Sequence, residues 1–108
     1  MLDIRCIVTV IERGKADKIV EHAKMAGASG ATILYGRGTG EHEIKRFLNI
    51  TIDSSKEIII MLAEAEKYKQ IKKAIIEAGR IKEAGTGIIF TIPVSDLTGL
   101  HHRGEFDI

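Results

Sequence analysis

The spacing of hydrophobic positions changes along the chain, and each spacing indicates one kind of element. In residues 2–11, apolar and polar positions first alternate, and then apolar residues occupy both sides of the segment. This pattern is typical of a long strand that is covered on both faces toward its end. From Ala16 the apolar positions recur at helical spacing, so we predict a helix that ends near Gly27. Residues 31–35 are strand formers and predict a second strand that stops at the following glycines.

The second half of the chain repeats this succession after a long connection. We predict that the connection spans about residues 36–56, and that its apolar part, residues 47–52, docks onto another surface such as a neighbouring subunit. The elements expected after it are a strand at 57–62 buried on both faces, a helix at 63–78 capped by Gly79, a strand at 88–92 ended by Pro93, a short strand within 94–100 and a tail at 101–108.

This order of elements predicts the fold class. It is that of an α+β protein with the ferredoxin-like split βαβ arrangement, βαββαβ plus a short C-terminal strand, in which an antiparallel sheet carries two helices on one face. The length of 108 residues predicts a single domain over residues 1–108. Because the strands carry apolar residues on both faces, we expect another subunit to cover the face without helices, and the long connection favours a ring of subunits.

The composition narrows the class of function. The chain is 44% apolar and 29% charged, which is typical of a globular protein, and its net charge of +1 gives no reason to expect nucleic acid or an anionic membrane as a partner. The single cysteine, Cys6, excludes an internal disulfide and is expected to be a small buried hydrophobic residue. No apolar run reaches the roughly 20 residues of a membrane span and no signal-peptide pattern is present, so we expect a cytoplasmic protein.

Two glycine-rich segments carry the candidate chemistry. Residues 36–40 read GRGTG, and residues 85–87 read GTG directly before an apolar strand. Glycine lets the backbone approach a ligand closely, and free N–H groups beside Arg37 suit an anion. We therefore hypothesise that the two segments face each other across a cleft that binds a small anionic molecule.

The residues alone leave two other functions open. A hydrolase of the acylphosphatase type needs an arginine in the first strand–helix loop and an asparagine that positions water, and Arg13 and Asn49 are the candidates. A metal-binding trimer similar to the CutA group needs His42, His101 and His102 to converge at a subunit contact.

Several short motifs follow one another in a recognisable order along the predicted elements. They are GASGAT at 27–32, GRG at 36–38, GTG at 85–87 with Ile89 and Phe90, IPV at 92–94, and Gly99 with Leu100. In this order, and over most of the chain, they resemble the PII family of nitrogen-regulatory signalling proteins. The resemblance implies a non-enzymatic homotrimer whose long connection, the T-loop, touches a target protein such as a membrane transporter or a metabolic enzyme.

The resemblance also implies a ligand site between subunits. In the family the site takes adenine nucleotides, so ATP or ADP is expected, and 2-oxoglutarate joins Mg-ATP there. The implied nucleotide-binding residues of this chain are Thr32, Gly36, Arg37, Gly38, Thr39, Gly85, Thr86, Gly87 and Ile88.

This chain departs from the family pattern at several ligand positions. Where the family has a phosphate-contacting lysine this chain has Ile88, and where it has two arginines on the last strand this chain has Gly99 and His101. The family's glutamine, which helps to hold metal and 2-oxoglutarate, is matched by Gly40. The family's lysine at the start of the third strand is matched by Lys56 or Glu57, depending on the alignment. No tyrosine lies between Gly40 and Asp53, so the family's uridylylation site is absent. Because charge-assisted hydrogen bonds are the strong ones, the lost cations reduce the attraction of a triphosphate. With these departures we do not expect the family's 2-oxoglutarate sensing. A nucleotide or another small anion is still expected at residues 85–87 and Arg37.

Overall fold

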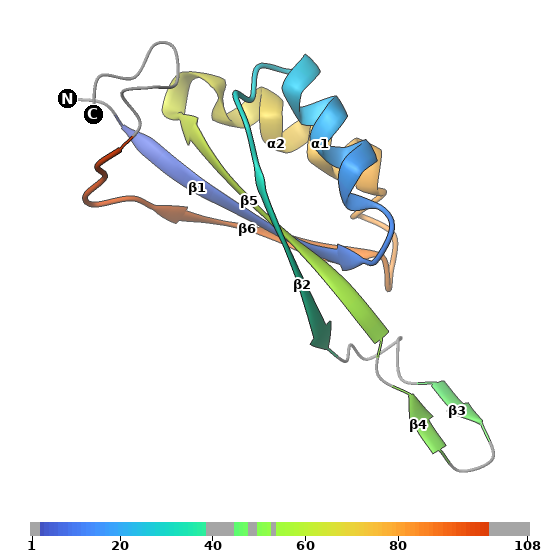
Figure 1. The fold of residues 1–108 in the computed structure, drawn as a ribbon. Helices are drawn as coiled ribbons and strands as arrows, with labels where there is room; N and C mark the ends of the chain where they lie inside the picture. Colours follow the sequence, from blue (N-terminus) through green and yellow to red (C-terminus); the bar gives the residue numbers. More distant parts are fainter. Residues whose placement is uncertain (1–2, 39–44, 48–49, 53, 100–108) are drawn as a thin grey trace.

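An open four-stranded antiparallel sheet carries both helices on one of its faces (Figure 1). The computed structural model describes residues 3–38, 45–47, 50–52 and 54–99. The elements are, in chain order, β1 (Ile4–Glu12), α1 (Ala16–Met25), β2 (Thr32–Gly38), β3 (Lys45–Phe47), β4 (Ile50–Ile52), β5 (Ser54–Glu64), α2 (Ala65–Gly79) and β6 (Gly87–Pro93). The predicted ferredoxin-like α+β fold is therefore confirmed.

The strand register separates the residues of the sheet into two faces. The strands lie in the order β2-β5-β1-β6, so β2 and β6 are the edges. Thr9 pairs with Ile59 and Ile89, and these side chains face the helices. Side chains alternate along a strand, so the neighbouring Val8 belongs to the opposite face together with its partner Phe90.

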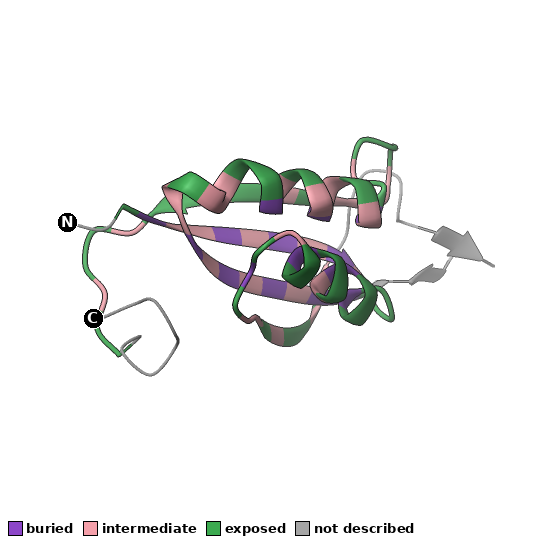
Figure 2. Ribbon diagram, turned by 90° about the horizontal axis from the view of Figure 1, so that it is seen from above, coloured by how far each residue is buried: buried purple, intermediate pink, exposed green. Residues whose placement is uncertain are grey.

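The core lies between the sheet and the helices and is built mainly from isoleucine. Its largest fully buried side chains are Ile7, Thr9, Ile11, Ile19, Ile59, Met61, Ile71 and Ile75. Each buried isoleucine contributes roughly 1.5–3 kcal/mol through the removal of apolar surface from water. The apolar positions that recur at helical spacing in α1 and α2 face this core, as predicted. Figure 2 shows buried residues alternating with partly buried ones along the central strands, as one covered face requires.

The face of the sheet without helices is apolar and open in the single chain. Leu34, Ile88, Phe90 and Ile92 are between 44% and 58% exposed there. The prediction that residues 57–62 are buried on both faces is therefore wrong for the isolated chain, in which only the face toward the helices is covered. Cys6 is likewise only partly buried rather than a core residue.

One corner of this open face is covered by the chain that follows β6. Ile4 is buried there against Leu62, Val94 and Leu97, and the Val94 N–H donates a 3.1 Å hydrogen bond to the Ile4 carbonyl. Residues 94–99 make no strand, so the predicted C-terminal strand is wrong over this range. The rest of that prediction, and the tail at 101–108, lie outside the described residues.

The connection between β2 and β5 is shorter than the sequence predicts. Gly36 pairs with Lys56 and Gly38 pairs with Ser54, so the first and last residues of the predicted connection at 36–56 belong to the sheet. Pairing with β5 satisfies the backbone groups of these glycines, which outweighs their weak preference for strands. Within the connection, β3 and β4 pair as an antiparallel hairpin, which Figure 1 shows beyond the end of the four-stranded sheet.

The second helix is displaced from its predicted position. It begins at Ala65 because β5 continues to Glu64, and the Ala65 N–H donates to the Asp3 carbonyl at 2.9 Å. Its C-cap is Arg80 with φ of 53°, so the prediction of Gly79 as the cap is wrong. Gly79 is instead a buried residue of α2, and an added Cβ would lie 3.0 Å from Ile19 Cδ1, so this side chain would have to shift to accept it. Neither helix of the described chain has the length and hydropathy needed to cross a membrane.

Candidate functional site

The two glycine-rich segments lie at the same end of the sheet but on opposite edges. Tyr35 on β2 is level with Glu57 on β5, Ile11 on β1 and Gly87 on β6. Three strand spacings of about 4.8 Å separate the two edges by roughly 14 Å. The segments therefore do not form one cleft within a single chain, and their meeting across a subunit contact stays a prediction.

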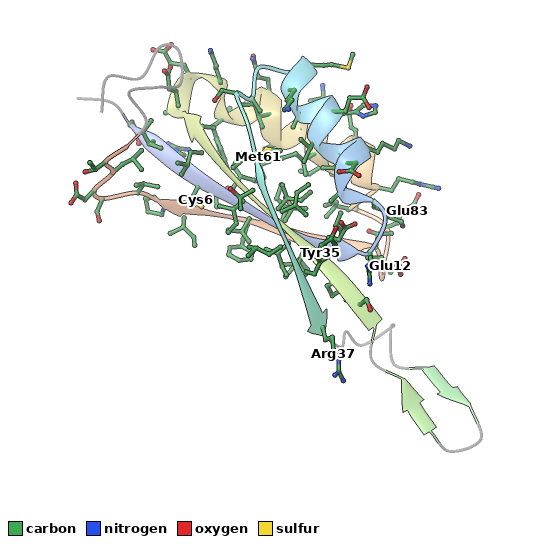
Figure 3. All side chains as sticks on the ribbon, viewed as in Figure 1. Cys6, Glu12, Tyr35, Arg37, Met61 and Glu83 are labelled. Carbon is green, nitrogen blue, oxygen red and sulfur yellow. The ribbon has the colours of Figure 1, made fainter. Side chains whose placement is uncertain are left out.

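A cavity of about 450 Å³ lies where β2 and β5 leave the sheet. Its lining residues are Arg13, Tyr35, Gly36, Arg37, Ser55 and Lys56. The Arg13 guanidinium carbon lies 5.1 Å from the centroid of the Tyr35 ring, so the arginine stacks on an aromatic face. Arg37 projects from the end of β2 (Figure 3). The exposed Arg13, Arg37 and Ser55 are hydrogen-bond donors that can bind an anion here, whereas Lys56 is only 6% exposed.

The register also decides between two neighbouring residues at the start of β5. Lys56 lies in the cavity lining, while Glu57 points to the helix side and binds the start of α1. Of the two residues left open by the resemblance, Lys56 lies among the lining residues of the cavity but is only 6% exposed, and the carboxylate of Glu57 is bound by the start of α1.

The loop after β1 is already occupied by a carboxylate of the chain itself. Glu57 Oε1 accepts hydrogen bonds from the backbone N–H groups of Gly14 and Ala16. The acylphosphatase hypothesis would place the phosphate of a substrate in this loop, beside Arg13 and the free backbone N–H groups. Because Glu57 takes these donors, the loop offers little support for that reaction. Asn49, the second residue of that hypothesis, lies outside the described residues.

The turn before β6 has a fixed geometry. The Thr86 hydroxyl donates to the carbonyls of Arg80 at 2.8 Å and Glu83 at 2.9 Å, and Gly85 has φ of 78°, where a side chain would be strained. At Gly87, an added Cβ would lie 2.5 Å from the Val10 carbonyl oxygen, so only glycine fits beside β1.

The remaining predicted site residues are spread over the molecule. Ile88 and Thr32 are exposed, and the register places them on the open face of the sheet, at opposite edges. Thr39 lies outside the described residues, as do His42, His101 and His102. Within the part of the chain that the structure describes, no group of three His, Cys, Asp or Glu residues could hold a metal ion.

Sequence reasoning did not find two contacts of this region. The sequence pattern indicates a strand position for Tyr35 and a candidate role in hydrolysis for Arg13, and it does not predict that the two side chains stack. The hydrogen bond between Glu57 and the N-terminus of α1 joins residues 41 positions apart, and no local sequence motif predicts it.

Comparisons with known proteins agree with this architecture. The family profile described as "Nitrogen regulatory protein P-II" matches residues 4–103. Among solved structures, Arabidopsis thaliana PII bound to citrate is similar with a TM-score of 0.69 at 23% identity, covering 96% of this chain and 91% of that one. A Bacillus cereus protein related to NIF3 has a TM-score of 0.68 at 15% identity, and the match covers 88% of this chain but only 26% of that protein.

At these identities the two structures support the fold alone. No curated protein sequence matches the chain. The family profile, in contrast, spans every element described above, including β2, β5 and the turn before β6. The chain therefore belongs to the nitrogen regulatory protein P-II family.

Proposed function

We propose that the protein is a P-II-type regulator that works as a homotrimer. It binds an adenine nucleotide, ATP or ADP, in clefts between subunits and is not itself an enzyme. The connection between β2 and β5 contacts a target protein in the cytoplasm, such as a transporter or a metabolic enzyme of nitrogen metabolism, and the ligand sets the shape of that connection.

The placement of the two glycine-rich segments is the observation that carries this proposal. They share one end of the sheet but occupy its opposite edges. In a ring of identical chains, the β2 edge of one subunit can face the β6 edge of the next. Arg13 and Arg37 of one subunit and the backbone N–H groups at 85–87 of its neighbour would then approach the same phosphates.

The open apolar face supports assembly. Ile88 is 58% exposed, and Phe90 and Ile92 are 44% and 47% exposed beside it. A contiguous apolar patch of this kind on an isolated chain marks an interaction site. The family resemblance favours three copies as the closed assembly that covers it.

The cavity at Arg37 supports an anionic ligand rather than a neutral one. The similar Arabidopsis protein was crystallised bound to citrate, which is a small anion. With a glycine at position 40 and isoleucine at position 88, this chain lacks family groups that hold 2-oxoglutarate and phosphates. We therefore expect a nucleotide to bind without the additional binding of 2-oxoglutarate.

Calorimetry with ATP, ADP, AMP and 2-oxoglutarate tests the ligand, and light scattering tests the assembly. We expect a mass about three times the 11.9 kDa of one chain and saturable heat with ATP or ADP.

Arg37→Ala should weaken nucleotide binding by about fivefold, as expected for the loss of one partly exposed charge-assisted contact. Lys24→Ala, an exposed cation on α1, is the matched control and should leave binding unchanged. Absence of heat with every nucleotide would remove the sensor proposal and leave the fold intact.

A further inference from the structure

A second cavity lies along α2 and the turn that follows it, and it shares no lining residue with the cavity at Arg37. Its volume is about 610 Å³, within the range of small-molecule sites. It is lined by Tyr68, Lys69, Lys72, Lys73, Ile76, Glu77, Arg80, Lys82 and Glu83. We call this cavity the α2 groove. It contains no residue of the proposed nucleotide site.

The charges of the α2 groove do not cancel. Arg80 donates to Glu83 through Nε at 3.0 Å and through a terminal nitrogen at 2.8 Å, so these two neutralise each other. The other four cations are lysines, and Glu77 is the one remaining carboxylate among the lining residues. Within the described chain, Lys69, Lys73 and Lys82 make no ion pair with a carboxylate. The groove therefore keeps a net positive charge in a protein that is close to neutral.

The Tyr68 ring lies among cations and is bound to the sheet. Its phenol oxygen accepts a 3.0 Å hydrogen bond from the Thr91 hydroxyl, and its ring lies 5.7 Å from Lys72 Nζ and 4.8 Å from the Arg5 guanidinium carbon. The Thr91 hydrogen bond and the charges of Lys72 and Arg5 lower the pKa of Tyr68 below its ordinary value of 10.0. The ring is also held in place, because the hydrogen bond ties α2 to β6.

The walls of the α2 groove are apolar although its rim is charged. The Tyr68 ring and the partly buried Ile76 lie about two helical turns apart on α2, and the methylene stems of the lysines lie beside them. A purely polar anion would gain little from these walls, and a neutral apolar molecule would gain nothing from the ammonium groups. The matching chemistry is an organic molecule with an apolar body and more than one negative charge.

We propose that the α2 groove is a second binding site, distinct from the nucleotide cleft, for amphipathic organic anions. The Tyr68 ring and Ile76 hold the apolar body, and Lys69, Lys72, Lys73 and Lys82 hold the negative groups. The turn that supplies Arg80, Lys82 and Glu83 leads into residues 85–87. A ligand in the groove therefore contacts the chain just before the proposed phosphate-binding turn.

The aromatic disulfonate bis-ANS, whose fluorescence rises when it leaves water, is a suitable probe on the full-length assembled protein. We expect saturable binding of one dye per chain that weakens as salt is added. The charge reversal Lys72→Glu/Lys73→Glu should lower the affinity about tenfold. The matched reversal Lys18→Glu/Lys24→Glu on the exposed face of α1 should change it less than twofold. Equal losses from the two double variants would overturn the proposal.

A competitor and a variant separate the α2 groove from the alternatives. Citrate, which has the charge but no apolar body, should displace the dye only weakly, and displacement at dye-like concentrations would show that charge alone attracts anions. ATP is itself an anion with an aromatic body, so the Arg37→Ala variant separates the two sites: it weakens nucleotide binding and should leave the affinity for the dye unchanged, because Arg37 does not line the groove. A loss of dye affinity equal to its loss of ATP affinity would show that the groove is part of the nucleotide cleft. If the charge reversal impairs folding, as judged by circular dichroism, the neutral variant Lys69→Gln/Lys73→Gln at exposed positions provides the same comparison.

Discussion

Glu57 on β5 accepts a 3.2 Å hydrogen bond from the backbone N–H of Ala16, the first residue of α1. It also accepts one from Gly14, while Lys15, the N-cap residue, makes no side-chain cap of its own. A carboxylate near a helix N-terminus satisfies unpaired N–H groups and interacts favourably with the helix dipole. The cap that the local sequence lacks is thus supplied by a strand from the other half of the chain.

Replacing Glu57 tests this long-range cap. Glu57→Ala should lower the free energy of unfolding by about 1–3 kcal/mol, because it leaves buried N–H groups without an acceptor. Glu57→Gln keeps an acceptor oxygen and should lose clearly less. Urea unfolding at fixed protein concentration measures both, with Glu21→Gln on the exposed face of α1 as the control. A Glu57→Ala variant as stable as that control would contradict the capping role.

The glycines at the two edges of the sheet should respond differently to an added methyl group. At Gly87, a Cβ would meet the Val10 carbonyl oxygen at 2.5 Å and Ile11 Cγ2 at 2.8 Å, so Gly87→Ala should cost about 1–3 kcal/mol through overpacking. At Gly38 the nearest atom is Lys56 Cγ at 3.7 Å, an ordinary contact. Gly38→Ala should therefore change the free energy of unfolding by less than about 0.5 kcal/mol in the same assay. Similar losses at both positions would show that packing at Gly87 is not the cause.

Two threonines on the helix side of the sheet provide a matched pair. The Thr9 hydroxyl is fully buried and has no hydrogen-bond partner among the described residues, whereas the Thr91 hydroxyl donates to Tyr68. Thr9→Val removes an unsatisfied polar group and should raise the free energy of unfolding by about 1 kcal/mol. Thr91→Val removes a satisfied one and should lower it by about 0.5–1.5 kcal/mol. If the melting temperatures of both variants, measured by calorimetry, shift in the same direction, the two hydroxyls do not contribute to stability with opposite signs.

The parts of the fold that depend on local pattern could be predicted from the sequence. Alternation in residues 2–11 identified β1, and the helical spacing of Ala16, Ile19 and Ala23 identified the buried side of α1. Each of these signals lies within one element, where side-chain direction follows directly from backbone period.

The features that the sequence did not reveal depend on contacts between distant segments. The glycines at 36 and 38 look like a loop until β5 is placed beside them, because only pairing satisfies their backbone. Tyr35 and Arg13 come together because β2 and β1 flank the same strand. Gly79 resembles a helix cap by composition, but it is the last residue of α2 and lies buried against Ile19. The glycine-rich segments were recognised as a candidate site, whereas their separation by two strands required the sheet order.

The pKa of Tyr68 predicts a pH dependence. The Thr91 hydrogen bond, followed by the charges of Lys72 and Arg5, lowers this pKa below 10.0 against the opposing effect of desolvation. A group whose pKa is lower in the folded state contributes stability that is fully present above its unfolded pKa and is lost as the pH falls through its folded pKa. Stability from Tyr68 should therefore rise as the pH is raised toward 10.0 and be absent at neutral pH.

Phenolate absorbance checks this prediction. In a Tyr35→Phe background Tyr68 is the one remaining tyrosine, so its titration can be followed directly. Adding Thr91→Val should move the Tyr68 pKa upward, and adding Thr9→Val should leave it in place because the Thr9 hydroxyl makes no hydrogen bond to Tyr68. An unchanged midpoint in the Thr91→Val protein would mean that the hydrogen bond does not set the pKa.

The open face of the sheet gives the sharpest test of assembly. Phe90 is 44% exposed in the single chain and lies in the apolar patch with Ile88 and Ile92, so Phe90→Asp places a charge where the proposed subunit contact must be dry. We expect sedimentation velocity to show a shift from trimer to monomer, together with weaker nucleotide binding because the cleft needs two subunits. Met25→Asp, at a residue that is 81% exposed at the end of α1, is the matched control and should remain trimeric. If Phe90→Asp sediments as the wild type does, copies of this chain do not associate through that face. The cleft between the β2 and β6 edges would then need another route to bring the two glycine-rich segments together.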